Sequence, residues 1–169
     1  MEIAYFAKDK SASSYLFLKG DGKMIIRNMI ESDADEVFEV MKVFYNSPAV
    51  LSNGSDEIFK SDIENCVSDN PFLEGYVFVE DNKMLGYAMI AKSFSTEYGK
   101  QCLWLEDLYM KPESRGLGIG TKFFKYIENT YSNCIIRLEV EEENQRAIHT
   151  YQKCGYDFLE YKEMKKILD

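Results

Sequence analysis

The segment from Arg115 to Thr121 has the residue types and spacing of an anion-binding loop. Its three glycines, Gly116, Gly118 and Gly120, alternate with aliphatic residues, so several backbone N–H groups can turn toward one point without obstruction by a Cβ atom. A helical pattern begins directly afterwards at Lys122, and the positive end of its dipole adds to the same point. The segment therefore predicts a binding site for a phosphate group.

This segment can be interpreted as one of several kinds of phosphate site or as a turn that binds no ligand. A dinucleotide fingerprint has the spacing Gly-x-Gly-x-x-Gly early in a βαβ unit, whereas these glycines are equally spaced and lie late in the chain. An acidic residue at a suitable separation, Glu139 or Glu141, keeps a Rossmann-type nucleotide site open. A Walker loop is disfavoured because Gly120-Thr121-Lys122 inverts the required order. A flexible turn that binds nothing is the simplest alternative.

Two motifs, in order along the chain, resemble those of the GNAT superfamily of N-acetyltransferases. The segment from Arg115 to Gly120 is similar to the Arg/Gln-x-x-Gly-x-Gly/Ala loop by which that family holds the coenzyme A pyrophosphate, and the preceding Leu105–Met110 resembles its central strand. Downstream, a strand-like Leu138-Glu139-Val140 precedes Asn144, Ala147, Tyr151 and Gly155-Tyr156, which resembles the second signature. The resemblance covers about residues 24–164 and implies an acetyl-CoA-dependent N-acetyltransferase.

The elements that would position these motifs form a mixed α/β (α+β) pattern. Helical spacing predicts helices over about 32–45 and 58–67, and three strands follow without a helix between them, which indicates an antiparallel meander. A helix after the glycines and a strand over 135–140 imply a parallel crossover. A helix over 144–154 and a last strand over about 156–164 complete a sheet flanked by about four helices. The resemblance implies that the parallel strands splay apart at its centre.

One domain accounts for this length. We expect residues 1–22 to be an N-terminal extension or accessory hairpin strand, with a hairpin across residues 19–23, and residues 23–169 to be the N-acetyltransferase domain.

The resemblance implies where coenzyme A would bind. Its pyrophosphate would lie on the glycine loop and its pantetheine arm would pair with the backbone of the central strand. Asn144 and Tyr151 lie seven residues apart on one helix, which places them on one face. The predicted cofactor-binding residues are Leu108, Tyr109, Met110, Arg115, Gly116, Leu117, Gly118, Ile119, Gly120, Thr121, Asn144 and Tyr151.

Two side chains are the candidate catalytic groups. The resemblance implies that Tyr151 protonates the leaving thiolate, and a phenol with its usual pKa of about 10 stays protonated at neutral pH. Glu106 is the candidate base that takes a proton from the amine through water, with Asp107 as the fallback and an ion pair with Lys or Arg as the structural alternative. Strand alternation places Trp104, Glu106, Leu108 and Met110 on one face and Asp107 and Tyr109 on the other. His149 is expected to face solvent.

Composition limits the partners. The net charge of −9 over 169 residues argues against nucleic acid and favours a cationic substrate. The acidic run 141–143 either attracts that substrate or complements a helix dipole.

Four scattered cysteines suggest reduced thiols in the cytoplasm and no metal site, and no apolar run is long enough to span a membrane. We expect a small-molecule amine as acceptor (a polyamine, amino-acid-like, aminoglycoside-like or peptide amine) and a possible homodimer. A non-catalytic acyl-CoA-binding module is the alternative.

Overall fold

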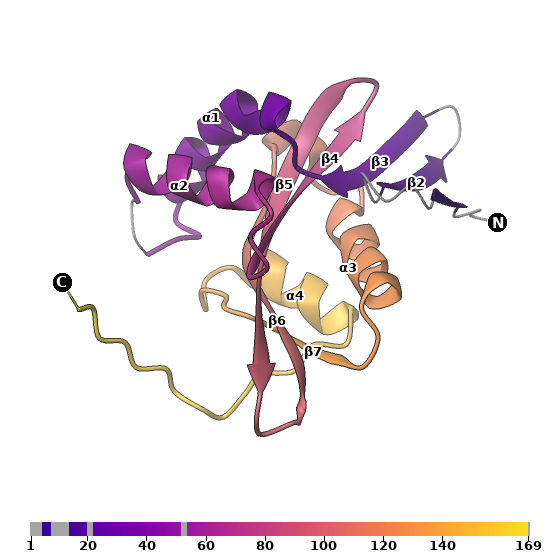
Figure 1. Cartoon of the computed structure of the whole chain (residues 1–169). Coiled ribbons are helices and arrows are strands. Elements are labelled where there is room, and N and C mark those ends of the chain that lie inside the picture. The colour runs from indigo at the N-terminus through magenta and orange to yellow at the C-terminus, as the bar shows by residue number, and fades with distance from the viewer. Residues whose placement is uncertain (1–4, 8–13, 20–21, 52–53, 169) are drawn as a thin grey trace.

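A single seven-stranded sheet organises the protein (Figure 1). The computed structural model describes residues 5–7, 14–19, 22–51 and 54–168. The strands lie in the sheet in chain order, and the last two are parallel whereas the other neighbours are antiparallel. They are β1 (Tyr5–Ala7), β2 (Ser14–Lys19), β3 (Gly22–Asn28), β4 (Leu73–Glu80), β5 (Lys83–Ser95), β6 (Lys100–Met110) and β7 (Cys134–Leu138).

Helices cover both faces of the sheet. One apolar cluster joins α1 and α2 to the sheet, and a second joins α3 and the partly buried residues of α4 to the opposite face. The α-helices are α1 (Ala34–Tyr45), α2 (Asp56–Val67), α3 (Ile119–Thr130) and α4 (Gln145–Lys153), with 3-10 turns over Glu31–Asp33 and Pro112–Ser114. The predicted mixed α/β fold with an antiparallel meander, a parallel crossover and four helices is confirmed, as is the hairpin formed by β2 and β3.

The two parallel strands pair over only half of β6. Their register begins at Gln101 with Cys134 and ends at Leu105 with Leu138. Residues 106–110 of β6 continue beside β5 alone, so on their other side the backbone N–H and C=O groups are not used in the sheet. The predicted separation of the parallel strands is present at this point.

A β-bulge at Glu106 changes which face each residue of β6 occupies. The register with β5 passes from Ile90–Leu105 to Met89–Asp107, which leaves Glu106 without a partner. Leu103, Leu105 and Leu108 all contact the α3 cluster, although strict alternation would separate Leu105 from Leu108. The predicted face that joined Trp104 to Leu108 and Met110 is therefore wrong, because the extra residue reverses the alternation.

The predicted last strand is also wrong. Residues 156–168 form no helix or strand, and the segment leaves the body of the protein (Figure 1). Its first residue, Tyr156, still packs against Phe124 and Tyr151, at ring-centroid distances of 5.1 and 6.1 Å. A strand is stable only beside a neighbour, and within the described chain this segment has none.

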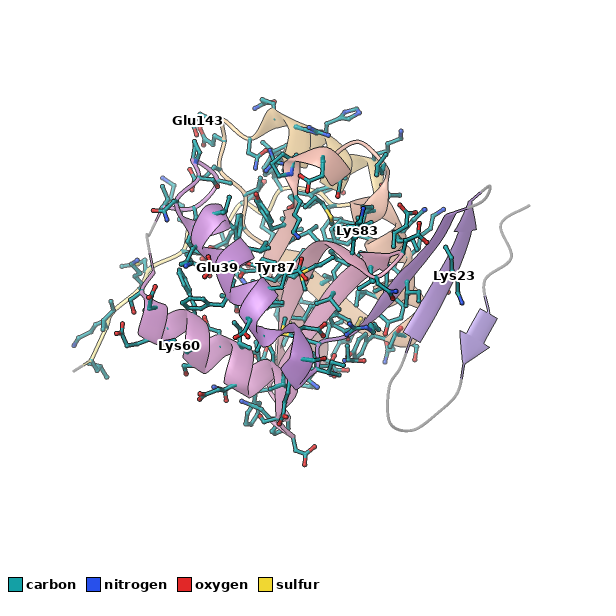
Figure 2. All side chains as sticks on the ribbon, turned by 90° about the horizontal axis from the view of Figure 1, so that it is seen from above. Lys23, Glu39, Lys60, Lys83, Tyr87 and Glu143 are labelled. Atoms are coloured by element: carbon teal, nitrogen blue, oxygen red, sulfur yellow. The ribbon has the colours of Figure 1, made fainter. Side chains whose placement is uncertain are left out.

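Asp107 joins α1 to the sheet through two hydrogen bonds. The Tyr45 hydroxyl at the end of α1 donates to Oδ1 at 3.1 Å, and the Tyr87 hydroxyl of β5, seen between α1 and the sheet in Figure 2, donates to Oδ2 at 2.8 Å. Asp107 is only 3% exposed. Its burial raises the pKa of the carboxyl to about 6, against the lowering effect of the two tyrosines.

Replacing Asp107 by Asn should change how stability depends on pH. A folded pKa of about 6 against an unfolded value of 3.8 means that the protonated form stabilises the fold at low pH and that this contribution is lost as pH rises through about 6. Relative to Asp107→Asn, the wild type should lose about 1.4 kcal/mol of unfolding free energy between pH 5 and pH 7, measured by urea denaturation.

Tyr87→Phe is the matched variant. It removes one hydrogen bond that lowers the pKa of Asp107, so the loss of stability should extend to a higher pH and be larger in total. Equal pH dependence in wild type and Asp107→Asn would contradict the assignment.

Candidate active site

The predicted cofactor residues line one cavity of about 720 Å³. It lies between the end of β6, the glycine loop, the start of α3 and one side of α4. Of the twelve predicted residues, only Leu117 lies outside it, with its side chain 48% exposed. The cavity contains Leu108, Tyr109, Met110, Arg115, Gly116, Gly118, Ile119, Gly120, Thr121, Asn144 and Tyr151.

Backbone conformation explains two of the glycines. Gly116 and Gly118 have φ angles of +86° and +73°, in the left-handed region that a side chain disfavours. A Cβ atom on Gly118 would meet nothing within 4 Å, so conformation and not crowding requires glycine there. Gly118 is also the N-cap of α3, and the first backbone N–H groups of a helix have no partner within it. This arrangement offers hydrogen-bond donors to an anion.

Three basic side chains line the same cavity as this loop. Arg115 donates from Nε to the Met110 carbonyl at 3.1 Å, and its guanidinium lies 5.4 Å from the Tyr109 ring centroid. Arg146 and Lys153 also line the cavity, and within the described residues their side chains make no ion pair or hydrogen bond. Arg146 Nη2 would lie 3.6 Å from a Cβ placed on Gly116. These uncompensated cations suit a ligand with several phosphates.

Arg146 and Lys153 were not singled out in the sequence. A signal was present, since residues seven apart on a helix share one face, and both are basic in a chain of net charge −9. His149 lies between them on α4 and lines the cavity from an exposed position, in agreement with the expectation that it faces solvent.

Asn144 and Tyr151 lie at opposite ends of α4. Asn144 is its N-cap, and Oδ1 accepts a hydrogen bond from the Ala147 N–H at 3.3 Å, which leaves the amide nitrogen free to donate into the cavity. Tyr151 packs edge-on against Phe124 at 5.7 Å, and its hydroxyl makes no hydrogen bond to the described residues. Burial raises the pKa of Tyr151 to about 12. The phenol therefore stays protonated at neutral pH.

A second cavity of about 250 Å³ is lined by the residues of β6 that precede those of the first cavity. It is lined by Tyr45, Asp62, Leu73, Met89, Glu106 and Asp107. The bulge allows the neighbouring Glu106 and Asp107 to reach the same cavity, which alternation would forbid. Three of its six lining residues are acidic and none is basic, so it suits a cation.

Glu106 is one of two carboxylates of this cavity, with Asp62, that have no hydrogen bond or ion pair within the described residues. The residue as a whole is exposed, yet desolvation of its carboxyl group, followed by the charges of Asp107 and Asp62, raises its pKa. It makes no ion pair in the part of the chain that the structure describes, so the structural alternative of a pair with Lys or Arg does not hold. Asp107, the predicted fallback base, is instead held by Tyr45 and Tyr87.

Two further findings bear on the predicted partners. Across residues 5–7, 14–19, 22–51 and 54–168, no group of three or more His, Cys, Asp or Glu side chains is placed to hold a metal ion. Within the same ranges, every helix is too short or too polar to cross a bilayer. A Rossmann-type site is excluded by the sheet itself, because that fold needs a mostly parallel sheet and only β6 and β7 are parallel here.

Known proteins share both the sequence pattern and the fold. The model of the Acetyltransferase (GNAT) family matches residues 35–156. An N-acetyltransferase of Methanocaldococcus jannaschii is 32% identical over 137 residues, 79% of this chain and 78% of that protein. Thialysine N-epsilon-acetyltransferase of Sus scrofa is 28% identical over 145 residues, 78% of this chain and 83% of that one.

A solved structure extends the likeness to three dimensions. Aminoglycoside N-acetyltransferase AAC(6')-Iy in complex with CoA superimposes with a TM-score of 0.70 at 15% identity, over 89% of this chain and 98% of the other. The fold, the two motifs and the family match agree, and the chain belongs to the Acetyltransferase (GNAT) family of N-acetyltransferases.

Proposed function

We propose that this protein transfers the acetyl group of acetyl-CoA to a primary amine of a small molecule, by direct attack in a ternary complex. The observation that carries this proposal is that consecutive residues of β6 line two separate cavities of opposite character. Residues 108–110 line the larger, basic cavity, and the preceding residues 106–107 line the smaller, acidic one. An anionic acyl donor and a cationic acceptor would meet at the point where β6 and β7 separate.

The larger cavity fits coenzyme A in both charge and backbone chemistry. The glycine loop, the start of α3, Arg115 and Arg146 would hold the pyrophosphate. The unpaired side of residues 108–110 would pair with the amides of the pantetheine arm, and the Asn144 amide nitrogen would donate to one of its carbonyls. Acetyl-CoA supplies an activated thioester. No metal is part of the proposal.

The smaller cavity supports an acceptor that arrives as an ammonium ion. Amines with a lysine-like pKa near 10.4 are charged at neutral pH, and Asp62, Asp107 and Glu106 would attract that charge. A relative of this chain acts on thialysine and the structural neighbour on aminoglycosides, judged by their names. We propose an acceptor of this kind, polyamine or amino-acid-like, with more than one positive charge.

Two side chains would move the protons. Glu106 takes a proton from the ammonium, through a water molecule, which frees the nitrogen lone pair to attack the thioester carbon. As the new C–N bond forms and the C–S bond breaks, Tyr151 donates its proton to the sulfur and the nitrogen loses its second proton to solvent, so that a neutral amide and a free thiol leave. Tyr151 recovers its proton from solvent, and Glu106 returns its proton there. Tyr151 has the protonation state that its step requires, because burial keeps it protonated at neutral pH.

Three further expectations, about domain boundaries, location and oligomeric state, belong to the same proposal. Residues 23–169 would form the catalytic domain, with residues 1–22 as an accessory segment whose strands extend the sheet. The four free cysteines fit a reducing cytoplasm. The active form would be a homodimer.

Ligand binding tests the assignment of the larger cavity. Acetyl-CoA and desulfo-CoA should both raise the melting temperature in a thermal-shift titration, because a ligand that binds only the native state stabilises it. NAD and ATP should cause a smaller shift or none. A response to NAD or ATP alone, or to none of the four, would sink the proposal. With binding shown, release of free thiol on addition of amines would identify the acceptor class.

Removal of one hydroxyl group tests the proton donor. Tyr151→Phe should lower kcat on the order of 10²-fold or more while affinity for acetyl-CoA stays the same, because the ring and its packing remain. Tyr156→Phe is the matched control: it removes a neighbouring buried hydroxyl that has no partner, and kcat should not change. Unchanged turnover in Tyr151→Phe would exclude Tyr151 as the proton donor, whereas a wild type that binds acetyl-CoA without any turnover would favour the acyl-CoA-binding module.

Two carboxylates of the smaller cavity should give different kinetic effects. Glu106→Gln should lower kcat on the order of 10²-fold and abolish the fall of activity at acidic pH, since a base with a raised pKa loses activity as it becomes protonated. Asp62→Asn should instead raise the KM for the amine roughly fivefold, as expected for loss of about 1 kcal/mol of ion pairing. A pH profile with the same acidic limb in Glu106→Gln would exclude Glu106 as the base.

A further inference from the structure

The last two residues of α1 line different cavities. Phe44 lines the larger cavity and Tyr45 the smaller one, just as Leu108 lines the larger and Asp107 the smaller on β6. The Tyr45 hydroxyl donates to Asp107 at 3.1 Å, which joins the two elements at this point. The end of α1 and residues 107–108 of β6 therefore mark the boundary between the two cavities, and Phe44 lies on the side of the larger one.

The Phe44 ring is held on three sides by tyrosines. Its centroid lies 5.5 Å from that of Tyr45, 6.4 Å from that of Tyr87 and 5.3 Å from that of Tyr109. Two of these tyrosines donate their hydroxyl groups to Asp107. Side chains packed in this way cannot give way without disturbing their neighbours. The ring is therefore a fixed part of the cavity wall.

The Phe44 side chain is not wholly absorbed by the core. It is half-buried, packs on the apolar cluster of α1, α2 and the sheet, and also lines the larger cavity. Phe38, one and a half turns earlier on α1, packs edge-on against Phe59 at 6.4 Å and lines neither cavity. The part of the Phe44 ring that its neighbours leave uncovered is thus available to a ligand.

The proposed reaction places the acyl group beside this ring. The thioester must be reached by the Tyr151 hydroxyl and by an amine bound near Glu106. Tyr151 packs on the α3 cluster, whereas Phe44 packs on the α1 cluster of the opposite face, and both line the larger cavity. With the pantetheine arm along residues 108–110, the acyl chain would extend from the sulfur toward the boundary between the cavities, where Phe44 lies.

We propose that Phe44 sets the length of the acyl chain that this protein accepts, by closing the acyl end of the larger cavity to chains longer than acetyl. This inference rests on the proposed function, because it concerns the donor of the same reaction. Each methylene beyond acetyl would meet a ring that cannot move aside. Extra methylenes in a closely packed site are unfavourable. One methylene in an apolar pocket changes specificity about 10- to 200-fold.

The affinities of three donors test the proposal without knowledge of the amine. Calorimetric titration of the full chain would give Kd for CoA, acetyl-CoA and butyryl-CoA. The wild type should bind acetyl-CoA about tenfold or more tightly than butyryl-CoA. Phe44→Ala removes the ring and should bring the two Kd values within about threefold of each other, because the longer chain can occupy the space.

A second variant guards against loss of the fold. Phe44→Ala leaves a space among three tyrosines and is expected to lower the melting temperature. Phe44→Leu keeps an apolar side chain there and should improve the binding of propionyl-CoA relative to acetyl-CoA, with a smaller gain for butyryl-CoA. Unfolding cannot produce tighter binding of a longer donor.

Phe38→Ala is the matched control. It removes the other half-buried phenylalanine of α1, away from both cavities, and should keep the wild-type ratio of the acetyl-CoA and butyryl-CoA affinities. An equal change of this ratio in Phe38→Ala and Phe44→Ala would mean that loosening of α1, and not the ring itself, widens the cavity.

Three results would overturn the inference. They are a wild type that binds acetyl-CoA and butyryl-CoA equally, Phe44 variants that keep the wild-type ratio, and a Phe38→Ala variant that changes the ratio as much as Phe44→Ala does. In each case binding of CoA itself would leave the proposed function standing. A wild type that binds none of the three donors would instead contradict the proposed function.

Discussion

The fold brings its two cavities together through one extra residue in β6. Because the bulge leaves Glu106 without a partner on β5, the residues before and after it can both keep apolar side chains on the α3 side of the sheet. On the other face, Asp107 and Tyr109 turn toward α1 and α2. A regular strand would direct Glu106 and Asp107 to opposite faces. The bulge lets both carboxylates line the smaller cavity, and the strand then continues into the larger one.

The second constraint on the site is the distribution of charged residues between the two cavities. The chain carries nine more acidic than basic residues, yet the larger cavity collects Arg115, Arg146 and Lys153, none of which is engaged in an ion pair within the described residues. The smaller cavity lacks basic residues. A phosphorylated donor and a cationic acceptor would therefore be drawn to different cavities, and the field of the protein would disfavour either ligand in the other's place. This separation of basic and acidic residues between the two cavities supports the proposed substrates more strongly than the net charge does.

Local features could be predicted from the sequence, and features that depend on distant partners could not. The left-handed conformations of Gly116 and Gly118 and the spacing of Asn144 and Tyr151 on α4 are set within a few residues, so the predicted cofactor residues, Leu117 apart, lie around one cavity. Arg146, Lys153 and the lining residues that follow α1 were not among them. The bulge at Glu106 exists only in relation to β5, and the burial of Asp107 depends on Tyr45, 62 residues away. The missing last strand has the same cause, since strand propensity cannot supply a neighbour.

The adjacent acids Glu106 and Asp107 have similar side chains but different surroundings, and these give the two carboxyl groups different properties. Asp107 accepts two tyrosine hydrogen bonds, and these oppose the effect of its burial, whereas Glu106 has no such partner and its pKa is raised by desolvation and by nearby carboxylates. A group that must exchange protons during turnover needs access to solvent and a pKa moved toward neutrality. Glu106 has both. Asp107 has a raised pKa, but it is buried away from water and has a structural role. The more exposed acid is therefore the one suited to take the proton, and the buried acid holds α1 in place beside it.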